Sequence, residues 1–125
     1  ERNGAPETIA DLDRHAIIAY GDHAPTTLRN VNWLRGIGNK GQELRPTVLQ
    51  VNNIYGQLLA IESGLGVGAL PDYMITKNNN LCRVLPDLHG PVFDTYFVYP
   101  EEMRKSKRIT IFREFLEEKA REWQF

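Results

Sequence analysis

Short apolar runs alternate along the chain with segments that have the spacing of an amphipathic helix. Residues 15–20 (HAIIAY) form a nearly continuous apolar run, and residues 47–51 (TVLQV) form a second one. Runs of this length are typical of strands, and the lack of polar alternation in the first indicates burial on both faces, as in a parallel sheet. Further strands are predicted at residues 67–70, 81–85 and 95–99.

Helices are predicted between these strands. The first is capped by Thr26 or Thr27 and runs to Leu34. The second begins after Asn52 and Asn53, because the asparagine side chain accepts hydrogen bonds from the first helical N–H groups. Its apolar stripe at helical spacing consists of Ile54, Leu58, Ile61 and Leu65, and Gly64 and Gly66 end it. Short turns or helices are predicted at residues 9–12 and after an Asp72 cap.

The last predicted helix starts after Ser106 and presents a long apolar stripe. Its members are Ile109, Phe112, Leu116, Ala120 and Trp123. Such a stripe must bury against another surface, yet the preceding elements already make a small sheet, so we expect its partner to lie outside this chain. Strands that alternate with helices predict an α/β fold with a mostly parallel sheet.

Composition narrows the possible functions. The 125 residues suit one domain, and 15 basic against 16 acidic residues give a net charge of −1, which is not the basic footprint of a DNA-binding surface. The single cysteine, Cys82, excludes an internal disulfide and a multi-cysteine metal site, and we expect it to be a buried apolar residue in a strand. Without an opening signal peptide or an apolar run that could span a membrane, a cytoplasmic protein is expected.

A family resemblance is carried by residues 51–73. The stretch Val51-Asn52-Asn53 comes before a helix that runs into residues 60–73 (AIESGLGVGALPDY). This resembles the effector-binding domain of LysR-type transcription regulators, with its small polar pair and its "a-G-x-G-[IV]-[AG]-x-L-P" ending. Residues 7–12, 81–85 and 96–100 resemble the "dL", "L..vL" and "y.vyP" segments of the same family.

The resemblance implies a periplasmic-binding-protein-like type 2 fold of two lobes with an effector cleft between them. Residues 1–95 would be the second lobe, and residues 96–125 the return strand and C-terminal helix of the first. The rest of the first lobe and the N-terminal DNA-binding domain are absent from this sequence, so DNA would be bound only through that missing domain. The family also implies that the full-length protein is a homo-oligomer, either a dimer or a tetramer. A solute-binding protein of a transport system, which shares the fold, is the alternative.

The predicted effector contacts lie where two strands end. They are Tyr20, Gly21, Val51, Asn52 and Asn53. Open α/β sheets bind ligands beyond the carboxyl ends of their strands, and a helix N-terminus favours a carboxylate or another small anion. Simple capping by the two asparagines is the structural alternative, and the resemblance favours ligand contact.

Other roles follow from position and from the resemblance. Phe97, Tyr99 and Pro100 are predicted as the hinge where the chain crosses between lobes, with Phe97 buried in an edge strand. The predicted oligomer interface consists of Leu28, Val31, Trp33 and Val48. Burial of Trp33 under the loop at residues 36–41 is the alternative for that side chain.

No enzyme, cofactor or metal site is predicted. The glycines at positions 64, 66 and 68 follow a helix and lead into a strand, which is the reverse of the order in a phosphate-binding loop. His15, His23 and His89 have no ligand-spaced partners, Ser63 lacks the context of a nucleophile, and Asp11 and Asp13 are expected in turns and caps. The basic run at residues 104–108 is interpreted as a solvated surface.

Overall fold

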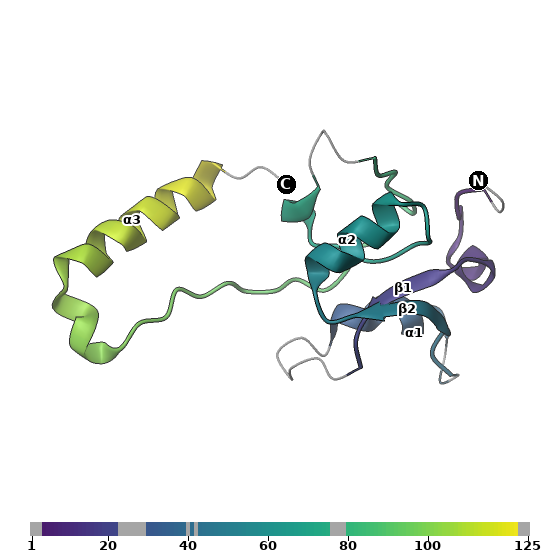
Figure 1. Ribbon diagram of the computed structural model, residues 1–125, viewed down its shortest axis with the longest axis horizontal. Helices are drawn as coiled ribbons and strands as arrows, with labels where there is room; N and C mark the ends of the chain where they lie inside the picture. The colour runs from purple at the N-terminus through teal and green to yellow at the C-terminus, as the bar shows by residue number, and fades with distance from the viewer. Residues whose placement is uncertain (1–3, 23–29, 40, 42, 76–79, 123–125) are drawn as a thin grey trace. The chain divides into compact units, whose positions relative to one another are not determined.

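The computed structural model (Figure 1) describes residues 4–22, 30–39, 41, 43–75 and 80–122. The chain divides into two compact units, Glu1–Pro91 and Val92–Phe125, and each is described by itself. Thr26, Thr27 and Leu28 of the predicted first helix and interface, together with His23 and Trp123, lie outside the described residues.

The first unit is built on two parallel strands, β1 (Ile17–Tyr20) and β2 (Thr47–Val51). The run predicted as a fully buried strand is confirmed with a later start, since Ile17, Ile18 and Ala19 are all buried. The side chain of Ile17 packs with Leu12 and Leu34 in the core cluster on one side of the strands. Leu12 belongs to η1 (Ile9–Arg14), the 3-10 helix that the sequence suggested as a turn.

The α2 helix (Ile54–Glu62) covers the other side of the strands and starts where the sequence predicts. Leu58 is 5% exposed and anchors its apolar stripe, but Leu65 is 48% exposed, because the helix ends at Glu62 and Gly64 turns the chain with a φ of 77°. A left-handed φ of this kind suits glycine at a helix end.

The predicted strand at residues 67–70 is reduced to a single bridge between Ile17 and Val67. The side-chain amide of Gln57 explains this, because its Nε2 donates to Ile18 O at 3.4 Å and to Ala69 O at 3.1 Å. Those bonds place a side chain between the two backbones beyond the bridge. Gly68 leaves the room for it, since a Cβ there would lie 3.1 Å from Nε2.

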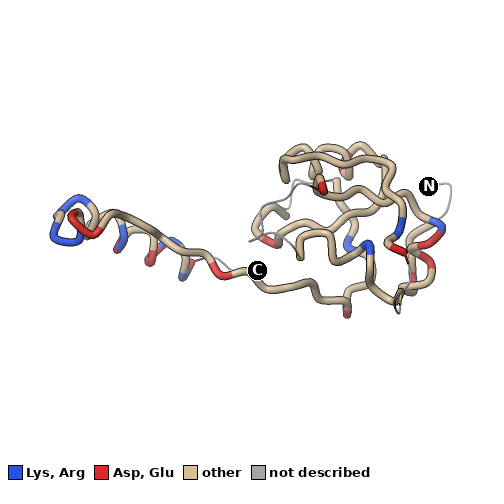
Figure 2. Tube along the Cα trace, turned by 90° about the horizontal axis from the view of Figure 1, so that it is seen from below, with Lys and Arg blue, Asp and Glu red and all other residues tan. Residues whose placement is uncertain are grey.

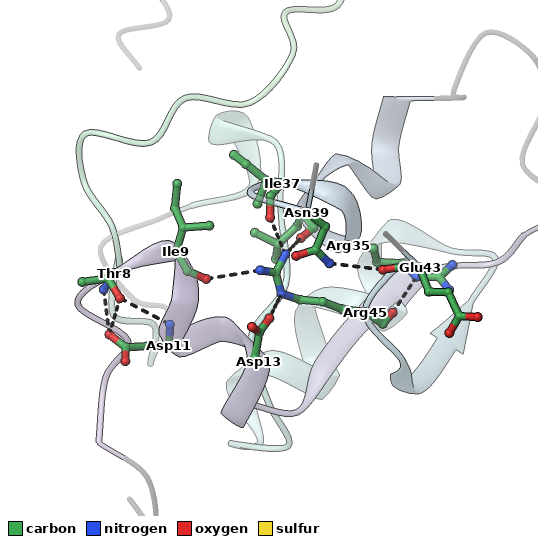
Figure 3. Close-up of polar contacts among 10 residues, drawn as sticks. Thr8, Ile9, Asp11, Asp13, Arg35, Ile37, Asn39, Glu43 and Arg45 are labelled. Carbon is green, nitrogen blue, oxygen red and sulfur yellow. Dashed lines mark hydrogen bonds and ion pairs between the residues drawn. The ribbon is translucent and has the colours of Figure 1, made fainter. Parts of the chain in front are cut away.

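A buried arginine ties the N-terminal elements of this unit together (Figure 3). Arg45 is 5% exposed, and its Nε lies 2.6 Å from the carboxylate of Asp13. The guanidinium also donates to three carbonyl oxygens, at 2.6 Å to Ile37, 3.3 Å to Leu34 and 3.3 Å to Ile9. It therefore joins η1 to the helix α1 (Trp33–Gly36) and the turn that follows.

Two helix predictions need correction. The first helix ends at Gly36, as predicted, but residues 30–32 form a 3-10 turn, so that only the four residues of α1 are α-helical in its described part. Asp72 does not cap the helix after it. It is the first residue of the 3-10 helix η3 (Asp72–Met74), and Pro71 occupies the cap position.

The strands predicted at residues 81–85 and 95–99 do not form, so both predictions are wrong. A strand needs a neighbouring backbone to exchange hydrogen bonds, and among the described residues neither segment has one. Leu85 instead adopts a φ of 50° and accepts a turn hydrogen bond from Leu88 N. Cys82 is consequently exposed rather than buried in a strand.

The second unit contains η4 (Glu101–Lys105) and the long helix α3 (Lys107–Glu122), which starts after Ser106 as predicted. Acidic and basic residues alternate along it (Figure 2), and none of its described residues is buried. Phe112 and Phe115 are each 50% exposed. Phe97 packs edge-on against Phe112 with ring centroids 5.5 Å apart, but it is 37% exposed and in no strand, so its predicted burial in an edge strand is wrong.

Candidate functional site

The parallel register brings the ends of β1 and β2 level with each other. Tyr20 pairs with Val51, the last residues of the two strands, and Gly21 N donates to Val51 O at 3.0 Å. The residues that follow, Gly21 and Asn52, are therefore neighbours at the carboxyl edge of the sheet. In open α/β sheets this edge is where ligands bind.

Two contacts lock the loops that leave the strands. Tyr20 Oη donates to the backbone oxygen of Asn52 at 2.8 Å. The side chain of Asn52 lies directly over Gly21, because a Cβ added to that glycine would come within 1.8 Å of Asn52 Oδ1. Glycine at position 21 is therefore a steric requirement for the position of the Asn52 amide. The sequence predicts that the ends of these two strands lie on one edge, and the structure brings Tyr20, Gly21 and Asn52 together there.

The two asparagines have different local roles. Asn53 is the N-cap of α2, and its side chain accepts hydrogen bonds from Tyr55 N at 2.8 Å and Gly56 N at 3.4 Å. Its predicted capping role is thus confirmed, and it satisfies part of the helix N-terminus itself. Asn52 lies outside the helix with an exposed side chain. Of the pair, Asn52 is the one whose amide is not used for the cap.

Few charged residues lie near the strand ends in the part of the chain that the structure describes. The α2 helix carries no charged residue before Glu62 (Figure 2). The nearest acidic group in the sequence, Asp22, accepts hydrogen bonds from Arg35 Nη1 at 2.8 Å and Gln50 Nε2 at 3.1 Å. The side-chain groups at Tyr20 and Asn52 are neutral hydrogen-bond donors and acceptors, which suit the binding of a polar ligand.

Asp22 and Asn52, which follow the two strands, are exposed. Two hollows of about 290 and 280 Å³ lie elsewhere in the first unit, and neither is lined by Tyr20 or Asn52. The first lies beside the buried Arg45, and the second lies between Glu7 and Leu88. Among the described residues, no three His, Cys, Asp or Glu side chains are grouped to hold a metal ion, and no helix is long and apolar enough to cross a membrane.

The predicted hinge residues lie in the second unit. Phe97 and Tyr99 have ring centroids 5.5 Å apart, and Pro100 is the N-cap of η4. The hinge itself stays a prediction.

The predicted interface residues are spread over the first unit. Val48 is 58% exposed on β2, and Val31 is half-buried before α1. Trp33 packs on the core and lies against Gly90, where a Cβ would come within 2.9 Å of the indole. Its packing partner is thus the segment before Pro91, a position that neither interpretation of the sequence anticipated.

Sequence reasoning missed three polar residues that organise the first unit. Asn32 binds the backbone of Tyr20, Arg45 binds η1 and α1, and Gln57 separates β1 from residue 69. Buried arginine and glutamine side chains need hydrogen-bond partners, but their partners here lie as far as 39 residues away. The sequence contains no local signal for such contacts.

Comparison with known proteins identifies the family. The family model described as LysR substrate binding domain matches residues 1–121. An uncharacterized HTH-type transcriptional regulator of Haemophilus influenzae is 26% identical over 114 residues, which cover 88% of this chain and 38% of that protein. The uncharacterized HTH-type transcriptional regulator YhjC of Escherichia coli is 26% identical over 126 residues, 92% of this chain and 39% of that protein. The chain thus spans about two fifths of the length of these relatives, and no solved structure matches it. With its α/β architecture and parallel strands, the chain belongs to the LysR substrate-binding domain family.

Proposed function

We propose that this chain is the effector-sensing part of a LysR-type bacterial transcription regulator. It binds a small effector, with an anion as the preferred class, at the loops that follow β1 and β2. The observation that carries the proposal is the contact between these loops, in which Tyr20 holds the backbone of Asn52 and Gly21 makes room for its amide. Membership of the LysR substrate-binding family supports a sensing role.

The exposed position of Asn52 supports a binding surface completed by another part of the protein. In this proposal residues 1–95 are the second lobe, and residues 96–125 return to the first lobe across a hinge at Phe97, Tyr99 and Pro100. The half-exposed side chains of Phe112 and Phe115 on α3 then pack in that first lobe. A ligand held between two lobes changes their arrangement only by binding one arrangement better than another.

The oligomer is also part of the proposal. Val48 on β2 and Val31 beside α1 are the candidate contacts with a second subunit, and DNA is bound by a separate N-terminal domain. The near-neutral charge of this chain agrees with that division of labour.

The effector site is tested in the intact regulator with a library of small carboxylates and phosphates, screened by thermal shift. A compound that stabilises the protein is then titrated calorimetrically. Asn52→Ala should weaken its binding about tenfold or more, because a lost hydrogen bond to a charged group is worth roughly 1.5–3 kcal/mol. Asn39→Ala is the matched control, since that amide donates to Glu43 O in a turn remote from β1's carboxyl end.

Unchanged affinity in Asn52→Ala, with the control also unchanged, would remove Asn52 from the site. If no carboxylate or phosphate of the library stabilises the protein, the anionic class of effector is overturned. Asn53→Ala, at the other predicted contact, also removes the cap of α2 and should lower the free energy of unfolding by about 1 kcal/mol, so its stability is measured together with its affinity.

A further inference from the structure

Asn32 makes a pair of hydrogen bonds that its position on a helix does not require. It is the N-cap residue of α1, yet its side chain makes no capping bond. Instead Oδ1 accepts from Tyr20 N at 2.9 Å and Nδ2 donates to Tyr20 O at 2.8 Å. Asparagine at an N-cap normally bonds the helix's own N–H groups. Here the amide binds the end of β1 as a neighbouring strand would.

The bonds continue the pairing of β1 at a point where no strand is available. Ile18 N donates to Val67 O on the edge of β1 opposite β2. Because backbone groups alternate along a strand, Tyr20 faces that same edge two residues later. Asn32 occupies it, and on the other edge the next residue, Gly21, donates its N–H to Val51 O of β2 at 3.0 Å. The end of β1 is therefore held from both sides.

From Tyr20 the connection continues into the candidate site. The phenol Oη donates to Asn52 O at 2.8 Å, and Gly21, the next residue in the chain, lies under the Asn52 amide. We infer that Asn32 is a positioning residue of the effector site, which acts through Tyr20 to fix the loop that holds Asn52. The inference rests on the proposed function for its biological meaning, but the connection itself can be tested without an effector.

This placement links the site to α1. Asn32 lies between Val31 and Trp33, and Trp33 packs against the core and Gly90. A displacement of α1 therefore moves the Asn32 amide relative to Tyr20. Conversely, a ligand that shifts Tyr20 would act on α1 through Asn32, because energetic coupling between two sites is reciprocal.

Hydrogen exchange of the intact protein, read by mass spectrometry, tests the connection. Asn32→Ala removes two hydrogen bonds from Tyr20 and should accelerate exchange in residues 17–22 on the order of tenfold. Asn32→Ala should also accelerate exchange in residues 51–56. Both Asn32 side-chain bonds go to Tyr20, so this effect must pass through the bond from Tyr20 Oη to Asn52 O. Asn39→Ala is the matched control, with an unchanged rate in both segments. If the alanine variant does not fold, Asn32→Asp is measured in its place, because it keeps the acceptor for Tyr20 N and removes only the donor to Tyr20 O.

Tyr20→Phe distinguishes positioning from general destabilisation. It deletes only the bond to Asn52 O and should accelerate exchange in residues 51–56. If Asn32 acts through Tyr20, adding Asn32→Ala to Tyr20→Phe changes residues 51–56 little further. Fully additive effects on that segment, or no effect of Asn32→Ala on it, would overturn the inference.

A ligand arm separates this inference from the proposed function. Sodium benzoate, succinate and phosphate at millimolar concentration are tested by thermal shift on the wild type and both asparagine variants. A probe that stabilises the wild type should bind about tenfold more weakly to Asn32→Ala and equally well to Asn39→Ala. Equal binding to Asn32→Ala would count against positioning. Failure of every probe on the wild type would count against an anionic effector and leave the exchange result to decide the role of Asn32.

Discussion

Replacing Arg45 with methionine is expected to destabilise the first unit strongly. Methionine fills much of the same volume but removes every donor from a site that is 5% exposed. The carbonyl oxygens of Ile9, Leu34 and Ile37 then lose a charged donor together. The carboxylate of Asp13 also loses its partner.

The structure allows the cost to be divided. The side chain of Asp13 is 59% exposed, so its ion pair is solvent-screened and worth no more than about 1 kcal/mol. The three carbonyl oxygens account for the larger part of the destabilisation, because a buried acceptor without a donor costs roughly 1–3 kcal/mol. Only the bond to Ile37 O is short, at 2.6 Å, while those to Leu34 and Ile9 are 3.3 Å. With about 2 kcal/mol for the Ile37 bond, about 0.5 kcal/mol for each of the two longer bonds and at most about 1 kcal/mol for the ion pair, Arg45→Met should cost about 3–4 kcal/mol.

Urea unfolding followed by far-ultraviolet circular dichroism measures this cost. Asp13→Ala should lower the free energy of unfolding by only about 1 kcal/mol, because water can reach the vacated site. Arg83→Met is the matched control on an exposed arginine and should change it by less than about 0.5 kcal/mol. If Asp13→Ala costs as much as Arg45→Met, the ion pair dominates and the three carbonyl bonds do not carry most of the stabilisation.

Three other perturbations test separate features. Gly66→Ala should destabilise the chain by roughly 2 kcal/mol or more in thermal melts, because its Cβ would lie 2.2 Å from the backbone oxygen of Ala16, and a wild-type melting temperature would refute that close approach. The pKa of Asp11 is lowered to about 2 by hydrogen bonds from Thr8 and by Arg14, so its contribution to stability is present above pH 4 and is lost as the pH falls towards 2. The stability difference between wild type and Asp11→Asn should shrink over that range, and a difference independent of pH would contradict the assignment. This chain alone should self-associate at high concentration through the stripe of α3, and light scattering should show a monomer after Phe112→Asp; a monomeric wild type would mean that the stripe needs no partner.

Local sequence determined the parts of this protein whose physical causes are local. The β2 strand has the predicted bounds, because a short apolar run flanked by proline and asparagine has few alternatives. Asn53 caps α2 as predicted, since its side chain reaches only N–H groups two and three residues ahead. The candidate site residues were selected from the same local signals, together with the rule that ligands bind at the carboxyl ends of strands.

Tertiary structure decided everything that depends on a partner distant in the sequence. The segments at residues 81–85 and 95–99 have the composition of strands, but a strand exists only where another backbone accepts its hydrogen bonds. The loops of Tyr20 and Asn52 meet because the parallel register places their strand ends level. Asn32 and Arg45 look like ordinary polar residues in the sequence. Their roles come from backbone groups that only the folded chain brings within hydrogen-bonding distance, because a buried polar side chain is stable only where such partners converge.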